Sequence, residues 1–192
     1  MQVKKTIMNE KIMIAGAGGQ GNIFIGELLC LAATYEDKYT TGIPSYGPEA
    51  RGGKAKFTVV ISDKEIGSPI VDDLDVLIVM NGLSLDFISL VKPGGLAIIN
   101  QSLAKYDKSS RPDLDIVLIP IDKILKDASI DIRMSNMALL GAYLRKRQIL
   151  ELKNIFEALK DKLAKKFDAE KLEKILELNK KAFMLGYNFI SV

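Results

Sequence analysis

The chain of 192 residues contains no histidine, and this absence removes the commonest general base in proteins. Ser-His-Asp and Cys-His nucleophile systems are excluded, and so are zinc sites of the HExxH type. The one cysteine is Cys30, so neither a cysteine-ligated iron–sulfur cluster nor an internal disulfide is possible within this chain. Composition alone therefore removes most of the usual catalytic equipment, and we assign no catalytic residue and no metal site to this chain.

Long apolar runs are also missing. The longest, such as residues 76–80, have the length of a strand and fall far short of the roughly 20 apolar residues that span a membrane. Near the start, Glu10 and Lys11 interrupt any signal-peptide pattern. A single thiol fits a reducing compartment. The sequence therefore predicts a cytoplasmic protein that does not contact a membrane.

The net charge of +3 is small, and the excess of basic residues lies in the last quarter of the chain. From residue 145 onward there are 12 basic and 7 acidic residues. These basic residues alternate with glutamates and are not accompanied by an aromatic stacking platform. We interpret them as solvated helix faces and expect no nucleic-acid partner.

Apolar periodicity predicts an alternation of strands and helices, which is typical of an α/β protein. We expect strands at residues 12–15, 38–43, 55–61, 66–71, 75–80, 96–100 and 115–120. We expect helices at residues 23–33, at 84–91 with Pro93-Gly94-Gly95 ending it, and from 135 nearly to the end with a break near 166–168. The fold class is a mixed, mostly parallel sheet with helices on both faces and a helical C-terminus.

A glycine-rich turn connects the first expected strand to the first expected helix. Gly16, Gly18 and Gly21 satisfy the pattern GxGxxG, and Gly19 and Gln20 complete the segment. Glycines allow a tight turn and a close backbone approach to a ligand, while a helix N-terminus offers free N–H groups to an anion. These five residues are candidate cofactor-binding residues.

The surroundings of this turn leave three interpretations open. A dinucleotide site of the NAD(P) type needs an acidic residue that ends the second strand, whereas Glu36 and Asp37 precede the expected strand. Gln20 is also long and polar for a position beside a pyrophosphate. The turn is therefore an NAD(P) site, a tight connection that binds no ligand, or a site for another anionic group or a partner chain.

A second glycine-rich segment is the most unusual stretch of the sequence. A long loop in a compact domain is usually functional or a docking segment. Arg51 offers a forked cation for a phosphate or carboxylate, and its alternative is a surface ion pair with Glu49. Arg51 is a candidate for cofactor binding. The candidates for partner binding are Tyr46, Gly47, Pro48, Glu49, Arg51, Gly52 and Gly53.

Four further features have weaker signals. Asn81 follows the expected strand at 76–80 and is a candidate for the edge of a ligand site. Asn136 is expected to cap or orient the helix that follows it. Cys30 lies on an apolar helix face and is interpreted as a structural thiol. The acidic cluster at residues 72–75 is interpreted as a polar turn, with a metal site as the alternative.

The order of the motifs resembles one family, the gamma subunits of 2-oxoacid:ferredoxin oxidoreductases. The similarity covers about residues 10–145. Its motifs are GxGGQG at 16–21, SYGPEARGG at 45–53, ISDKEIGSP at 61–69, DVLIVM at 75–80, Pro93-Gly94-Gly95, and Asn136 with Leu140-Gly141-Ala142. The resemblance implies one Rossmann-like domain of the pyruvate/ketoisovalerate oxidoreductase gamma type over residues 1–192.

The resemblance also implies a function within a complex. Such enzymes convert a 2-oxoacid and coenzyme A to acyl-CoA, carbon dioxide and reduced ferredoxin. Thiamine diphosphate, magnesium and iron–sulfur clusters belong to the alpha, beta and ferredoxin-like delta subunits, and the gamma subunit contributes to coenzyme A binding and assembly. The form YGPEARGG resembles the 2-oxoglutarate branch, followed by the branched-chain branch.

Two other functions stay open from the residues alone: an independent NAD(P)-dependent oxidoreductase and a non-enzymatic binding module. If the resemblance holds, the isolated chain is inactive. We further expect Arg51 and the turn at 16–21 to face one anion, because the first strand and a neighbouring second strand would both end at the same edge of the sheet.

Overall fold

The computed structural model of the chain describes residues 8–47 and 52–190. In these residues, six strands form one sheet in the order β2-β3-β1-β4-β5-β6. The strands are β1 (Asn9–Ala17), β2 (Tyr39–Tyr46), β3 (Lys54–Ser62), β4 (Leu74–Val79), β5 (Val91–Asn100) and β6 (Asp115–Ile119). β1, β4, β5 and β6 are paired in parallel, whereas β3 is antiparallel to both of its neighbours. The predicted mixed and mostly parallel sheet is confirmed.

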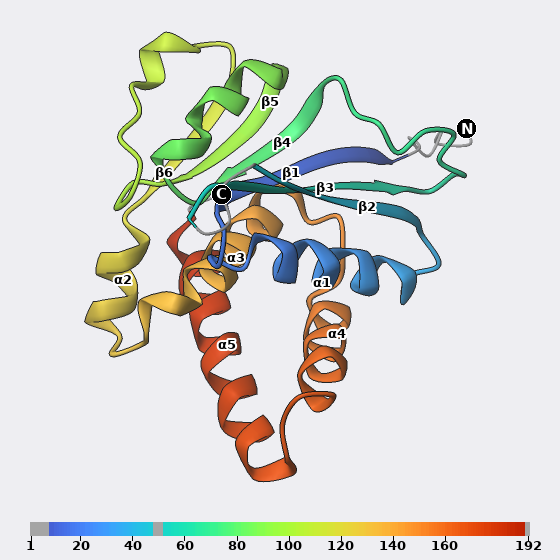
Figure 1. The fold of residues 1–192 in the computed structure, drawn as a ribbon, viewed down its shortest axis with the longest axis vertical. Helices are drawn as coiled ribbons and strands as arrows, with labels where there is room; N and C mark the ends of the chain where they lie inside the picture. The colour runs from blue at the N-terminus through green and yellow to red at the C-terminus, as the bar shows by residue number, and fades with distance from the viewer. Residues whose placement is uncertain (1–7, 48–51, 191–192) are drawn as a thin grey trace, which may run out of the picture.

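The helices divide unequally between the two faces of the sheet. The α-helices are α1 (Asn22–Thr34), α2 (Ile121–Asp127), α3 (Ser135–Arg147), α4 (Leu152–Ala164) and α5 (Ala169–Phe189), and the 3-10 helices are η1 (Gly82–Leu90), η2 (Lys108–Ser110) and η3 (Ile132–Met134). Helices α1, α3, α4 and α5 lie on one face of the sheet (Figure 1). Side chains of η1 pack against the other face. The expected break of the C-terminal helices is confirmed, because α4 ends just before it and α5 begins just after it.

Strand alternation creates two hydrophobic layers. In β1, Ile12 and Ile14 face the layer that contains the α-helices, whereas Met13 and Ala15 face the smaller layer beneath η1. Successive side chains of a strand point to opposite faces, so apolar residues at every position of a strand allow it to be buried on both sides. All four of these side chains are at most 3% exposed.

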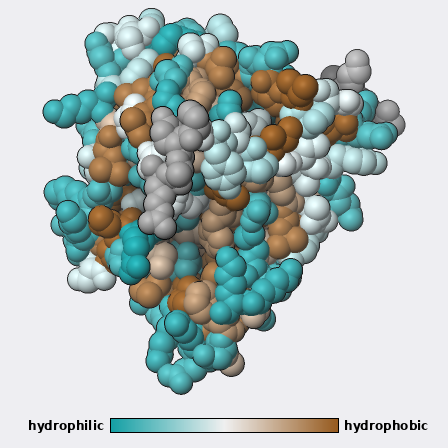
Figure 2. Space-filling model, viewed as in Figure 1, coloured by the Kyte–Doolittle hydropathy of each residue, from teal (hydrophilic) through white to brown (hydrophobic). Residues whose placement is uncertain are grey.

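The closest helix contact joins α3 to α5 and depends on two glycines. A Cβ atom on Gly141 would collide with the backbone carbonyl of Phe183, and one on Gly186 would collide with the carbonyl of Ala138. The two helix backbones can therefore approach each other only because these positions carry no side chain. The free end of α4 and α5 extends away from the sheet and carries mainly hydrophilic side chains on the visible face (Figure 2).

Several local expectations differ from the structure. The helix expected at 84–91 is the 3-10 helix η1, and Pro93-Gly94-Gly95 lies inside β5 instead of ending a helix. The strand tolerates this segment because the pairing of β5 with β4 shifts register there, between Leu74 and Val76. Residues 66–71 contain Pro69 and do not form a strand, and the short helix α2 was not expected.

The position of β2 also differs from the expectation. β3 pairs with β1 over its full length, from Asn9 opposite Ser62 to Ala17 opposite Lys54, so β2 lies at the sheet edge and is not a neighbour of β1. The chain folds back as a β2–β3 hairpin and places its second strand inside. No helix in the described ranges is long and apolar enough to cross a membrane.

Candidate functional site

The first glycine-rich segment forms the turn between β1 and α1, as expected. Gly21 has a φ of 83°, a left-handed conformation that favours glycine, and it precedes α1 as the N-cap. No side chain caps this helix end. The N-terminus of α1 therefore has the free N–H groups that suit an anion.

Gln20 fills the inside of this turn. Its Oε1 accepts a hydrogen bond from the Ala17 backbone N–H at 2.7 Å and another from Asn81 Nδ2 at 2.9 Å. A Cβ atom on Gly16 would lie 2.6 Å from this oxygen and 2.8 Å from Met80 Cβ, so Gly16 leaves the space that Gln20 occupies. Because Gln20 uses the Ala17 N–H, that group does not face a pyrophosphate. This geometry disfavours the NAD(P) interpretation.

The second glycine-rich segment lies against the first. The Gly18 N–H donates to the Gly53 carbonyl at 3.0 Å, and the Gly47 N–H donates to the Lys54 carbonyl at 2.7 Å. Gly52 has a φ of 75°, and Tyr46 is 67% exposed. One described end of this segment, at Gly53, is thus joined to the glycine turn by a direct hydrogen bond, and the Gly47 bond closes the segment at the start of β3.

Pro48, Glu49 and Arg51 lie outside the described residues. The expected position of the Arg51 guanidinium therefore stays a prediction, as do the binding roles of all residues in both glycine-rich segments. We expected the two segments to share a sheet edge because the first and second strands would be neighbours. That reason was wrong, because β2 is not adjacent to β1. The two segments meet because β3 begins opposite the end of β1.

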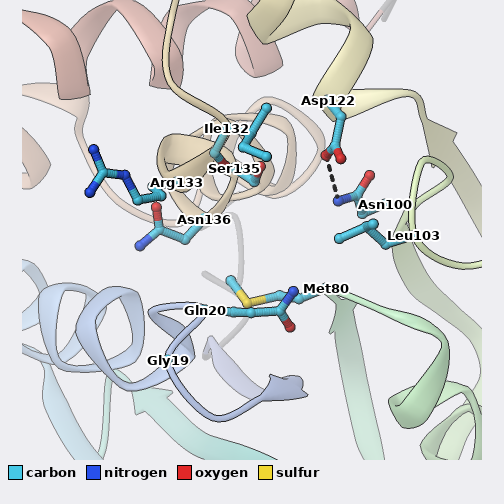
Figure 3. Close-up of a pocket in the computed structure, with 10 residues that line it drawn as sticks. All are labelled: Gly19, Gln20, Met80, Asn100, Leu103, Asp122, Ile132, Arg133, Ser135 and Asn136. Carbon is cyan, nitrogen blue, oxygen red and sulfur yellow. Dashed lines mark hydrogen bonds between the residues drawn. The ribbon is translucent and has the colours of Figure 1, made fainter. Parts of the chain in front are cut away.

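A cavity of about 270 Å³ opens where the parallel strands end. Ligands of open α/β sheets bind at this carboxyl edge. The cavity lies between the glycine turn and the segment that leads into α3 (Figure 3). It is lined by Gly19, Gln20, Met80, Asn100, Leu103, Asp122, Ile132, Arg133, Ser135 and Asn136.

Two asparagines are buried in this cavity wall. Asn100 is the last residue of β5 and is 1% exposed. Asn136 is 8% exposed and lies inside the first turn of α3, so it does not cap that helix. A Cβ atom on Gly21 would collide with the Asn136 amide, so Gly21 also makes room for this side chain. Asn136 thus connects α3 to the glycine turn.

Sequence reasoning missed Asn100, Asp122 and Arg133 as lining residues. Asn100 carried a usable signal, because it is a polar residue at the end of an apolar strand. Asp122 and Arg133 carried none, since they belong to α2, which was not expected, and to η3. Asn81 does not line the cavity but holds Gln20 and caps η1 through the Leu83 N–H.

The charges around the cavity are mostly paired. Arg133 donates to the Asp131 carboxylate from Nε at 2.9 Å and from Nη2 at 2.7 Å, and these hydrogen bonds lower the pKa of Asp131. The guanidinium of Arg133 points away from the cavity (Figure 3). Asp122 Oδ1 lies 3.4 Å from Asn100 Nδ2. No group of three or more potential metal-ligating side chains occurs in the part of the chain that the structure describes.

The fold defines an α/β protein with a cavity at the carboxyl edge of its sheet. The sequence matches the family "Pyruvate ferredoxin/flavodoxin oxidoreductase" over residues 11–189, and the chain belongs to this family. Within it, the chain is a gamma subunit of a 2-oxoacid:ferredoxin oxidoreductase. The resemblance found in the sequence is thereby confirmed, and the chain works as a subunit of a multi-subunit enzyme.

Two relatives illustrate the similarity. The 2-oxoglutarate synthase subunit KorC of Methanocaldococcus jannaschii is 33% identical over 192 residues, covering 97% of both chains. The ketoisovalerate oxidoreductase subunit VorA of Methanothermobacter marburgensis is 39% identical over 132 residues, covering 68% of this chain and 27% of the relative.

Solved structures share the fold. The keto/oxoacid ferredoxin oxidoreductase gamma subunit of Geobacter sulfurreducens superposes with a TM-score of 0.76 at 26% identity, covering 94% of this chain and 95% of that one. The 2-oxoglutarate:ferredoxin oxidoreductase of Magnetococcus marinus, solved with 2-oxoglutarate, coenzyme A and succinyl-CoA bound, gives a TM-score of 0.81 at 24% identity. This chain covers 32% of that longer chain, and 95% of this chain is matched.

Proposed function

We propose that this gamma subunit belongs to an oxidoreductase that converts 2-oxoglutarate and coenzyme A to succinyl-CoA, carbon dioxide and reduced ferredoxin. The observation that carries the proposal is the end-to-end match to the 2-oxoglutarate synthase subunit of Methanocaldococcus jannaschii. A branched-chain 2-oxoacid is the second candidate substrate, supported by the identity of 39% to a ketoisovalerate oxidoreductase subunit.

In this proposal the chain is one domain of a cytoplasmic complex and contributes binding and assembly instead of redox chemistry. Its lack of histidine and its single cysteine support that division of labour, since a subunit of this composition needs other chains for the electron transfer. Alpha and beta subunits would hold thiamine diphosphate and magnesium, and iron–sulfur clusters would lie in other chains, including a ferredoxin-like delta subunit.

The proposed contribution of this chain to catalysis is recognition of coenzyme A. The joined glycine-rich segments lie beside the uncapped N-terminus of α1, and that helix end favours an anionic group such as a phosphate. Arg51, in the same segment as Gly52 and Gly53, would supply a forked cation to that group. The alternative occupant is an acidic group of a partner subunit.

The substrate and partners are tested by purifying the native complex through a tag on this chain. We expect alpha, beta and delta chains to co-purify, and we expect the highest kcat/KM with 2-oxoglutarate when pyruvate and 2-oxoisovalerate are compared at saturating coenzyme A. A preference for 2-oxoisovalerate would select the second candidate. Absence of the three partner chains would contradict the proposal.

The anion contact is tested in the same complex with Arg51→Ala and Arg51→Lys. Loss of a forked cation should raise the KM for coenzyme A by about tenfold, or weaken assembly, with lysine restoring only part of it because a point charge lacks the fork. The KM for the 2-oxoacid should stay unchanged. An unaltered response to coenzyme A together with intact assembly would exclude Arg51 from the site.

A further inference from the structure

The two sides of the sheet are covered to different extents at the β2–β3 hairpin. Phe57 and Val59 of β3 belong to the hydrophobic layer that packs under the α-helices. The layer beneath η1 contains residues of β1, β4, β5 and β6 but, within the described residues, none of β2 or β3. Helix η1 lies over β1, β4 and β5 (Figure 1). One face of the hairpin is therefore left without a hydrophobic layer from the part of the chain that the structure describes.

The register of the strands identifies the side chains on this face. The residues of β3 that alternate with the buried set point to the η1 side. Ile43 is paired with Thr58 and Thr41 with Val60, and paired residues of neighbouring strands share a side of the sheet. Ile43 is 39% exposed, and Tyr39, at the end of the same face, is 51% exposed. We call the surface formed by these five side chains the hairpin face.

A hollow of about 260 Å³ continues the hairpin face at the amino edge of the sheet. Val60 forms part of one wall, and the segment between β3 and β4 forms another with Ile66 and Ile70. Ile70 is 74% exposed, more than any other large apolar side chain in the described residues. The energetically important side chains of protein interfaces insert into hollows of this kind.

Charged groups surround the hairpin face but do not occupy it. Lys38 pairs with Asp63 at 2.9 Å, and Lys54 pairs with Asp86 at 2.6 Å. The hairpin face itself consists of hydroxyl-bearing and apolar side chains. A neutral centre with a polar rim is the anatomy of a protein–protein interface. It offers no cluster of like charge to nucleic-acid phosphates or to lipid headgroups.

The outer edge of β2 is unsuited to the addition of another strand. The Gly47 N–H donates to the Lys54 carbonyl at 2.7 Å, so every second residue of β2 turns its backbone polar groups toward β3. Pro44 belongs to the alternate set, which faces outward. Proline has no N–H to donate, and on an edge strand it hinders pairing with another chain. A partner would therefore pack on the hairpin face instead of extending the sheet.

Longer relatives indicate the occupant of this face. The VorA subunit of Methanothermobacter thermautotrophicus aligns with 92% of this chain at 33% identity, yet the alignment covers only 35% of that relative. The remaining two thirds form a further region of the same polypeptide. Neighbouring domains of one chain share interfaces of about 600–1,500 Å². We infer that the hairpin face docks an apolar segment of the counterpart of this further region. The inference rests on the proposed function, in which that counterpart is another subunit of the complex.

The experiment purifies the native complex through a tag on this chain and compares variants. Ile43→Asp and Ile70→Asp should each lower the recovery of the counterpart subunit by at least about tenfold, because a carboxylate in an apolar contact is left without a partner. Both positions are exposed, so the thermal unfolding midpoint of each variant chain should stay within about 3 °C of wild type. Leu178→Asp is the matched control, since Leu178 is 40% exposed but lies on α5.

Photo-crosslinking of the complex identifies the occupant. With p-benzoylphenylalanine in place of Tyr39, we expect an adduct whose peptides align with the region of the VorA relative outside its match to this chain. No adduct, an adduct with a second copy of this chain, or one with a subunit that aligns with no part of that relative would overturn the inference. So would normal recovery in either Ile43→Asp or Ile70→Asp, or an equal loss in Leu178→Asp.

The inference and the proposed function fail in different ways. If the native complex contains the expected chains and acts on 2-oxoglutarate while the hairpin-face variants assemble normally, the docking face is wrong and the function stands. If the wild-type chain recovers no alpha, beta and delta chains, the proposed function is wrong.

Discussion

Buried polar side chains differ in their hydrogen bonding between the two ends of the sheet. At the carboxyl edge, the amide oxygens of Asn100 and Asn136 accept backbone N–H groups, their NH₂ groups donate to Asp122 and to the Gly21 carbonyl, and both residues line a cavity. At the start of β1, Glu10 Oε1, the Tyr143 hydroxyl oxygen and Arg147 Nε are buried without a hydrogen bond. Glu10 Oε1 and Arg147 Nε lie 3.4 Å apart as an ion pair. The first arrangement consists of carboxamides that line a cavity, whereas the second contains an ion pair between β1 and α3.

This difference separates a candidate binding site from a structural contact. Burial raises the pKa of Glu10 to about 7, with Arg147 acting against that shift, and burial likewise raises the pKa of Tyr143. A strongly shifted pKa often marks a functional site. Here the shifted group faces no cavity-lining residue, so the shift reports the cost of packing α3 against β1. Helix α3 spans both regions, with Asn136 in its first turn and Arg147 as its last residue.

The largest change in unfolding free energy is expected from a substitution where α3 crosses α5. It should disturb both ends of the sheet, because α3 contacts both. Gly186→Ala places a methyl group against the Ala138 carbonyl, and the helices must separate. Overpacking of this kind costs about 3 kcal/mol of unfolding free energy. Denaturant unfolding of the chain measures it. A loss within about 0.5 kcal/mol, the range of ordinary surface substitutions, would show that the crossing is looser than described.

Glu10→Gln should affect only the contact at the start of β1, and it should change the stability of the protein in a pH-dependent way. The folded-state pKa of about 7 lies above the ordinary 4.5, so wild-type stability falls as the pH rises from about 4.5 through 7. The variant lacks this loss, and its stability relative to wild type should increase by about 2 kcal/mol between pH 5 and pH 8. Unfolding curves at the two pH values test this, with Glu151→Gln as the exposed control. Parallel pH profiles of wild type and Glu10→Gln would contradict the account.

The smallest effect is expected on the solvated surface of α5. Lys174 forms an i,i+4 ion pair with Glu170 at 2.8 Å, and both side chains are exposed. Lys174→Ala should change the unfolding free energy by less than about 0.5 kcal/mol. A larger change would mean that this face of α5 contributes to packing or to binding, as a third region beside the two ends of the sheet.

Local signals in the sequence were sufficient for the framework of the site. The glycine pattern at residues 16–21 predicted the β1–α1 turn correctly. The turn needs positive φ angles and close packing, and the glycines that allow both lie within one short segment of the sequence. The strands β4 and β6 were predicted correctly because each contains a run of consecutive apolar residues. The insertion of β3 between β1 and β2 could not be predicted, since the alternation of β3 indicates a strand but says nothing about its partner.

The cavity itself could not be assembled from the sequence. Gln20, Asn100 and Asn136 are separated by 80 and 36 positions, and each meets the others only through the sheet and α3. In the sequence, Gln20 is a candidate cofactor-binding residue that is long and polar for a position beside a pyrophosphate, whereas in the structure its oxygen is held inside the turn. Its role depends on the absence of a side chain at Gly16, which is visible only in three dimensions.

The most direct test of the account measures the KM values of the assembled complex that carries Gln20→Glu. If the glycine turn that contains Gln20 helps to bind coenzyme A and the chemistry belongs to other chains, the KM for coenzyme A rises by about tenfold, while kcat and the KM for the 2-oxoacid stay within twofold of wild type. An unchanged KM for coenzyme A, or an equal loss with both substrates, would contradict it.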